Sequence, residues 1–153
     1  MNILDNIIIT PMKIEDAKSL ENILIEKFDD FWNYSIFCEE IGNTNSSYIV
    51  AKLTSQENII VGFAGIKKIL DEADIMNIVV RKDFRHNGIA TQLLNNLCVL
   101  AKSQNCNTIT LEVNEKNIYA IKLYQKQGFL TVGKRKNYYN GTDSAIIMTK
   151  TLT

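Results

Sequence analysis

The sequence has few of the residue types that mark metal sites, disulfide frameworks or membrane segments. Histidine occurs once among the 153 residues, at His86, which argues against a histidine-based metal site or catalytic triad. The cysteines Cys38, Cys98 and Cys106 are odd in number and lack C-x-x-C spacing, so they indicate reduced thiols. There is no apolar run of membrane-spanning length and no signal-peptide pattern at the N-terminus. We therefore expect a cytoplasmic protein without a bound metal ion or a membrane partner.

An excess of charge of either sign is also missing. Lys and Arg together number 17, as do Asp and Glu, so the net charge is zero and direct nucleic-acid binding is not expected. The sequence contains no linker, repeat or low-complexity segment that would divide the chain. With 46% apolar residues, the chain is long enough to bury one core, so we expect a single domain over residues 1–153.

Two glycine-rich nucleotide motifs are missing, although a related pattern is present. No G-K-[ST] follows a glycine, which excludes a P-loop, and no G-x-G-x-x-G occurs, which excludes the dinucleotide fingerprint. Instead, an apolar run at Ile75–Val80 leads through R-H-N-G-I-A, residues 85–90, into leucines at helical spacing. Helix N-termini bind phosphate through their free N–H groups, Gly88 lets a phosphate approach the backbone, and Arg85 adds positive charge. The loop predicts a phosphorylated cofactor, with a plain tight turn as the alternative.

The spacing of apolar residues predicts a chain that alternates between strands and helices. Helices are expected at Ile14–Phe28, Phe31–Ile41, Gly88–Gln104 and Asn117–Gln127, and strands at Ile7–Thr10, Tyr48–Leu53, Ile59–Leu70, Ile75–Val80, Thr108–Val113, Phe129–Lys136 and Ala145–Leu152. A turn is expected at Asp71–Ala73, and the dipeptide Asn140-Gly141 predicts a hairpin between the last two strands. This order predicts an α/β (α+β) fold with a single mixed sheet flanked by helices.

Three polar residues in the second half of the chain are candidates for chemistry. Glu112 alternates with Leu111 and Val113, so its carboxylate lies on the opposite face and suits general-base work, although a solvent-facing residue has the same pattern. Tyr124 shares a helical face with apolar residues, which is also typical of a core tyrosine. Asn117 starts a helix and is expected to be its N-cap.

An acidic cluster precedes the strand at Ile75–Val80. Asp71, Glu72 and Asp74 are typical of a solvated turn, but one of them could guide an amine substrate or share the role of a base. Cys98 and Cys106 have no histidine near them in the sequence, so a cysteine nucleophile is not expected.

Taken together, these segments resemble the GNAT N-acetyltransferases. The resemblance is carried by I-M-N-I-V-V, R-H-N-G-I-A and L-E-V-N-E-K-N-I-Y-A-I-K-L-Y-Q-K-Q-G-F. The pattern L-E-V…N…A-x-x-L-Y-x-x-x-G-F followed by R-K-N-Y-Y is more specific and resembles the RimI branch, which acetylates the N-terminal alanine of a small-subunit ribosomal protein. The match covers about Asp74 to Met148. In F-W-N-Y-S at residues 31–35, phenylalanine stands where that branch has proline.

The resemblance implies a GNAT fold, with a largely antiparallel sheet, and acetyl-CoA as the acetyl donor. It implies that the backbone of Ile78, Val79 and Val80 pairs with the pantetheine arm. The rest of the cofactor site would be the loop, the following helix start and one further residue: Arg85, His86, Asn87, Gly88, Ile89, Ala90, Thr91 and Asn117.

The resemblance also implies roles on the acceptor side. Glu112 matches the general base of the family and Tyr124 its general acid. Trp32, Tyr138 and Tyr139 would contact the acceptor, and the aromatic and basic R-K-N-Y-Y segment favours a peptide or protein N-terminus. Two alternatives stay open, namely a GNAT that acetylates a small amine such as a polyamine or a drug, and an acyl-CoA-binding module without turnover.

Overall fold

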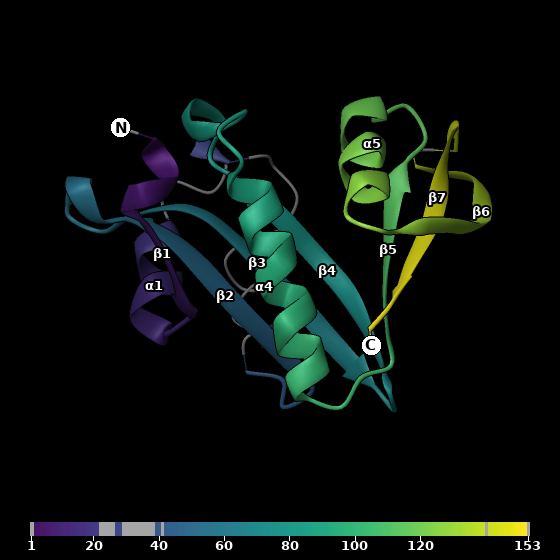
Figure 1. Cartoon of the computed structure of the whole chain (residues 1–153), viewed down its shortest axis with the longest axis horizontal. Helices are drawn as coiled ribbons and strands as arrows, with labels where there is room; N and C mark the ends of the chain where they lie inside the picture. Colours follow the sequence, from purple (N-terminus) through teal and green to yellow (C-terminus); the bar gives the residue numbers. More distant parts are fainter. Residues whose placement is uncertain (1, 22–26, 29–38, 41, 140, 153) are drawn as a thin grey trace.

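The computed structural model describes residues 2–21, 27–28, 39–40, 42–139 and 141–152. These residues form one seven-stranded sheet in the order β1-β2-β3-β4-β5-β7-β6 (Figure 1). The strands are β1 (Ile7–Pro11), β2 (Ser46–Leu53), β3 (Ile59–Ile69), β4 (Glu72–Val80), β5 (Thr108–Asn114), β6 (Leu130–Tyr139) and β7 (Asp143–Thr151). Neighbouring strands are antiparallel except β4 and β5, which are parallel. The predicted mixed, largely antiparallel sheet is confirmed.

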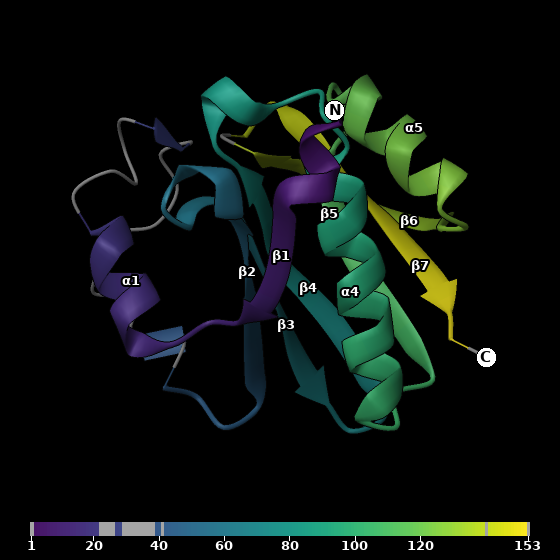
Figure 2. The ribbon, with the colours of Figure 1, turned by 60° about the vertical axis from the view of Figure 1, so that its left-hand side comes forward.

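Helices cover both faces of this sheet (Figure 2). They are α1 (Ile14–Leu20), α4 (Ile89–Ser103) and α5 (Ile118–Lys126), with short 3-10 turns at η1 (Ile3–Asn6), η2 (Thr54–Gln56) and η3 (Lys82–Phe84). One core lies beneath α4, whose residues Ile89, Leu93, Leu97 and Ala101 are buried at the spacing of a single helical stripe. A smaller core on the other face joins α1 to β2 and β3.

Strand β4 separates these two cores. Ile78 and Val80 pack against the core beneath α4, whereas Val79 packs against the core beneath α1. This alternation follows from the two-residue repeat of a strand. Both faces of β4 are therefore covered near its carboxyl end, and only its edge is left for a ligand.

The carboxyl half of β4 diverges from β5 (Figure 1). Among the described residues, β4 pairs with β5 only through Glu72–Asp74. Its register with β3 shifts between the pairs Gly65↔Asn77 and Ile66↔Ile75, so Met76 is an extra residue that forms a bulge. A bulge bends a strand and increases its twist. We attribute the divergence to it, because it lies where pairing with β5 stops. The edge of β4 beyond the bulge keeps unpaired backbone groups.

One expected turn is wrong. Glu72 pairs with Ile69 and Ala73 with Lys68, so the predicted turn at Asp71–Ala73 lies mostly inside β4. The chain turns instead at Leu70 and Asp71, with Leu70 at a φ of 58°. The side chain of Ala73 is fully buried, and this burial outweighs the turn preference of its acidic neighbours.

The first half of the chain is described only in part. The helix expected at Ile14–Phe28 begins as predicted and is described as α1 up to Leu20. Residues 22–26, the helix expected at Phe31–Ile41 except for Glu39 and Glu40, and the acceptor candidate Trp32 lie outside the described residues.

The hairpin between the last two strands is confirmed, but it is longer than expected and irregular. Pairing extends to Tyr139↔Asp143, whereas the preceding pair is Arg135↔Ala145. Three residues of β6 therefore face one of β7, and Asn137 adopts a left-handed φ of 53° with its N–H donating to Oγ of Ser144 at 3.3 Å. This bulge separates Tyr138 and Tyr139 from the regular part of the strand.

Candidate active site

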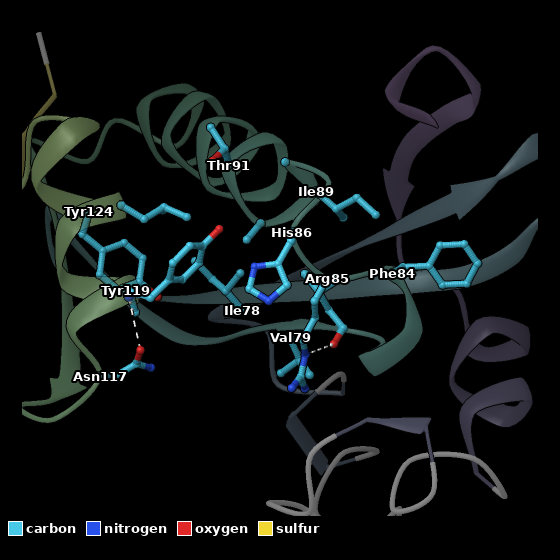
Figure 3. A pocket seen from close by; sticks show the side chains of 15 residues that line it. Ile78, Val79, Phe84, Arg85, His86, Ile89, Thr91, Asn117, Tyr119 and Tyr124 are labelled. Carbon is cyan, nitrogen blue, oxygen red and sulfur yellow. Dashed lines mark hydrogen bonds between the residues drawn. The ribbon is translucent and has the colours of Figure 1, made fainter. Parts of the chain in front are cut away.

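A cavity of about 370 Å³ lies between the open edge of β4, the start of α4, and α5 (Figure 3). It is lined by Ile78, Val79, Val80, Phe84, Arg85, His86, Gly88, Ile89, Ala90, Thr91, Asn117, Tyr119, Ala120, Leu123 and Tyr124. Residues from three separate segments of the sequence thus surround one space. Ten of the eleven predicted cofactor residues are among them; the exception is Asn87.

The loop from β4 to α4 forms one end of this cavity. Gly88 is the N-cap of α4 at a φ of 85°, a conformation that glycine adopts without steric cost. A Cβ at this position would also meet Cδ1 of Leu4 at 3.3 Å. The first residues of α4 line the cavity, so N–H groups that have no partner inside the helix lie at its wall. This arrangement suits an anionic group.

Two side chains brace the same loop. Nε of Arg85 donates to the carbonyl of Val80 at 3.2 Å, which ties the loop to the end of β4 (Figure 3). The Asn87 amide donates to the carbonyls of Phe84 at 3.0 Å and Arg85 at 3.1 Å. Asn87 therefore points back into the loop, which explains why it does not line the cavity.

The first turn of α5 forms the opposite wall. Oδ1 of Asn117 accepts a hydrogen bond from the N–H of Ala120 at 3.2 Å, so Asn117 is the N-cap that its sequence position predicts. Tyr119 lies with its ring 5.4 Å from that of His86 at 75°, and the two rings meet across the cavity. Its side chain is 61% exposed, and Leu123, four residues further along α5, also lines the cavity. This i, i+4 pair is the sequence signal that could have found Tyr119.

Tyr124 lies one to two turns further along α5 and also lines the cavity. Its half-buried ring packs 6.0 Å from that of Phe129. Burial, and to a smaller extent the neighbouring Tyr139 hydroxyl, raise the pKa of Tyr124 above its usual value. The hydroxyl is therefore fully protonated at neutral pH and available as a donor.

Glu112 stands on the face of β5 away from α4 and is not among the cavity-lining residues. Its Oε1 accepts from Nε of Arg135 at 3.0 Å. Burial, and then the charge of Glu112 and the neighbouring Tyr138, raise the pKa of Tyr139. Tyr139 therefore interacts electrostatically with both Glu112 and Tyr124.

The acidic residues at the start of β4 lie elsewhere. Glu72 and Asp74 are opposite Thr108 and Thr110, at the end of the sheet where β4 and β5 still pair. Neither lines the cavity. In the described part of the chain, no group of three or more His, Cys, Asp and Glu side chains could hold a metal ion, and no helix is long and apolar enough to cross a membrane.

A comparison with known families decides what this cavity belongs to. The sequence profile of the acetyltransferase (GNAT) family matches residues 13–129, well over half of the chain. The chain belongs to the GNAT acetyltransferase family. The predicted family and the predicted type of enzyme, an N-acetyltransferase, are confirmed.

Individual relatives of this GNAT acetyltransferase agree with the family match. The [ribosomal protein bS18]-alanine N-acetyltransferase of Haemophilus ducreyi is 37% identical over 112 residues, which cover 71% of this chain and 77% of that protein. The crystal structure of the ribosomal-protein-S18-alanine N-acetyltransferase from Escherichia coli has a TM-score of 0.84 at 27% identity and covers 96% of this chain and 94% of that one.

A more distant structure resembles this enzyme in fold. Arabidopsis thaliana NAA60 in complex with acetyl-CoA has a TM-score of 0.81 at 20% identity and covers 95% of this chain and 98% of that one. The same sheet and helices therefore support an acetyl-CoA complex in another member of the fold.

Proposed function

We propose that this GNAT acetyltransferase transfers the acetyl group of acetyl-CoA to the N-terminal α-amine, an alanine, of a small-subunit ribosomal protein in the cytoplasm. The observation that carries the proposal is that one cavity joins the anion-suited Gly88 loop, the open edge of β4 and Tyr124. The bS18-alanine acetyltransferases among its relatives support the choice of acceptor.

The described residues fit acetyl-CoA. The unpaired edge of β4 at Ile78–Val80 offers N–H and C=O groups to the amides of the pantetheine arm, in the manner of an added strand. The N–H groups of Gly88–Thr91 and the guanidinium of Arg85 suit the pyrophosphate. When bound, acetyl-CoA supplies an acetyl thioester that an uncharged amine can attack.

Tyr119 and His86 are expected to enclose the arm of the cofactor. Because their rings meet across the cavity, Tyr119→Ala should weaken acetyl-CoA binding by roughly two- to tenfold, the range for loss of one aromatic contact. Isothermal titration calorimetry measures this change. The matched control is Ile118→Ala, which removes the exposed neighbour of Tyr119 on the same helix turn and should leave the Kd unchanged. Equal Kd values for both variants and the wild type would contradict the assignment.

We propose that Glu112 is the general base and Tyr124 the general acid. The Glu112 carboxylate takes one proton from the ammonium group of the acceptor, directly or through a water molecule, and later releases it to solvent. The Tyr124 hydroxyl gives its proton to the leaving sulfur and regains one from the acceptor nitrogen as the amide forms. The raised pKa of Tyr124 suits this role, because the hydroxyl still carries its proton when the sulfur leaves. We propose direct transfer without a covalent enzyme intermediate, since neither described cysteine, Cys98 nor Cys106, lines the cavity.

A single carboxylate is better matched to an α-amine than to lysine. The α-amino group has a pKa of about 7.7–8.0 and the lysine side chain one of about 10.4. The difference of roughly 2.5 corresponds to about 3.5 kcal/mol less work to deprotonate an N-terminus. An N-terminal acceptor is therefore the chemistry that this site favours.

A panel of acceptors tests the proposed function. Acetyl-CoA is incubated with the enzyme and with an Ala-starting ribosomal peptide, the same peptide with a blocked N-terminus and an internal lysine, or a polyamine. We expect release of free CoA with the first peptide, at a rate at least tenfold above that with the others. Transfer to polyamines alone would overturn the proposed acceptor, and no CoA release with any amine would favour an acyl-CoA-binding module.

A further inference from the structure

The carboxylate proposed as the base is already held by a cation of the protein. Nε of Arg135 donates to Oε1 of Glu112 at 3.0 Å. Arg135 lies on β6 and Glu112 on β5, and β7 runs between these strands, so the arginine side chain reaches across one strand. A group that must receive a proton from an incoming ammonium is thus paired with a positive charge before the acceptor arrives.

This ion pair is easy to exchange. The side chain of Arg135 is 57% exposed and that of Glu112 is 29% exposed, and ion pairs at such exposure contribute little net free energy. The Arg135 guanidinium carbon also lies 5.6 Å from the ring centroid of Tyr138, within range of a cation–π contact. Tyr138 in turn packs edge-on against Tyr139 at 5.1 Å. The guanidinium therefore keeps a partner when it leaves the carboxylate.

The Glu112 carboxylate can bind the positively charged N-terminus of the acceptor in place of the Arg135 guanidinium. A protonated N-terminus carries the same single positive charge as the guanidinium and donates hydrogen bonds to a carboxylate in the same way. Burial, and to a smaller extent the charge of Glu112, raise the pKa of Tyr139, so its hydroxyl stays uncharged in the field of this carboxylate. The guanidinium and the ammonium group carry like charges and repel each other at one carboxylate, so binding of the acceptor opposes the pairing of Arg135 with Glu112.

We propose that Arg135 is a positioning residue that occupies, in the free enzyme, the site of the acceptor's N-terminal ammonium group, and that the acceptor displaces it toward Tyr138. The inference rests on the proposed function, because it takes Glu112 as the base. It makes Arg135 a determinant of specificity, since only an acceptor that brings a positive charge displaces the guanidinium. After transfer the N-terminus is an uncharged amide that no longer competes, so Arg135 pairs with Glu112 again once that carboxyl group has released its proton to solvent.

Peptide binding to the enzyme–CoA complex tests this inference without turnover. Arg135→Gln removes the competitor and should lower the Kd and the KM of an Ala-starting peptide by about two- to fivefold, the size of an exposed ion pair. The Kd of the N-acetylated peptide should not change, because that peptide never displaced Arg135. Arg135→Lys keeps the charge and should stay within about twofold of the wild type.

The matched control is Lys134→Gln, which removes the neighbouring charge of β6. Lys134 pairs with Glu115 at 3.4 Å, and the two side chains are 49% and 32% exposed. Lys134→Gln therefore removes one positive charge from an ion pair about as exposed as that of Arg135 and Glu112. Its Kd for the free-amine peptide should stay at the wild-type value. Tyr138→Leu removes the second partner of Arg135 and should raise the Kd of the free-amine peptide. This change is opposite to that expected for Arg135→Gln, and it tests the inference even if Arg135→Gln does not fold.

Three results distinguish failure of this inference from failure of the proposed function. If the wild type acetylates the Ala-starting peptide but Arg135→Gln binds it equally or more weakly, the displacement is wrong and Arg135 only braces the hairpin or contacts the acceptor. If Arg135→Gln binds the acetylated peptide more tightly to the same extent, the competition is not for the ammonium group and the inference is also overturned. If the wild type acetylates no N-terminal amine, the proposed function itself fails.

Discussion

Tyr124→Phe is expected to lower kcat by about 10²-fold or more, the usual contribution of a positioned general acid. The substitution removes the hydroxyl of a cavity-lining residue and keeps the ring that packs against Phe129. The Kd of acetyl-CoA, measured by calorimetry, should stay within about twofold of the wild type, because the phenyl ring preserves the wall. The lower kcat would then reflect a slower chemical step and not weaker binding of acetyl-CoA.

The pH dependence provides a second readout for Tyr124. Its pKa is raised above the usual value, so the donor form persists through pH 9 and kcat should not fall in this range because of Tyr124. Tyr48→Phe is the matched control, since Tyr48 is a buried tyrosine of the core beneath α1 that does not line the cavity, and its kcat should change by less than about threefold. A large loss of acetyl-CoA affinity in Tyr124→Phe would instead make Tyr124 a packing residue of the cofactor site.

Glu112→Gln should reduce kcat/KM for an Ala-starting peptide by about 10²-fold or more at pH 6.5, and by much less at pH 9. An α-amine with a pKa of about 7.7–8.0 is mostly charged at the lower pH and needs the base, whereas it is mostly neutral at the higher pH and does not. Initial rates of CoA release over this pH range measure the effect. A loss of equal size at every pH would indicate that Glu112 positions the acceptor and does not remove its proton.

The control for Glu112 is Glu115→Gln, near the end of the same strand. Glu115 accepts from the N–H of Ser144 at 2.6 Å, a contact that the glutamine oxygen can keep, and it lies outside the cavity lining. Its pH profile should match that of the wild type. Asp74→Asn and Glu72→Gln address the acidic candidates on β4, and a pH-dependent loss in either variant comparable to that of Glu112→Gln would mean that the base role is shared.

The local parts of the site follow from the sequence because they depend on short-range physics. The left-handed Gly88 and the buried stripe of α4 are consequences of turn chemistry and helical spacing within about twenty residues. The orientation of Glu112, opposite to the buried Leu111 and Val113, follows from the two-residue repeat of a strand. The N-cap role of Asn117 is equally local. These features would be expected in any fold that keeps the same elements.

The tertiary structure decided the features that depend on which segments become neighbours. The bulge at Met76 and the end of β4–β5 pairing at Asp74 open the edge of β4, and no local pattern marks either point. Tyr119 meets His86 only because α5 is packed opposite the β4–α4 loop. The ion pair between Arg135 and Glu112 depends on the strand order β5-β7-β6, which brings residues 23 positions apart into contact across a third strand. Sequence periodicity specifies the face of each element, whereas long-range packing determines which charge and which ring that face meets.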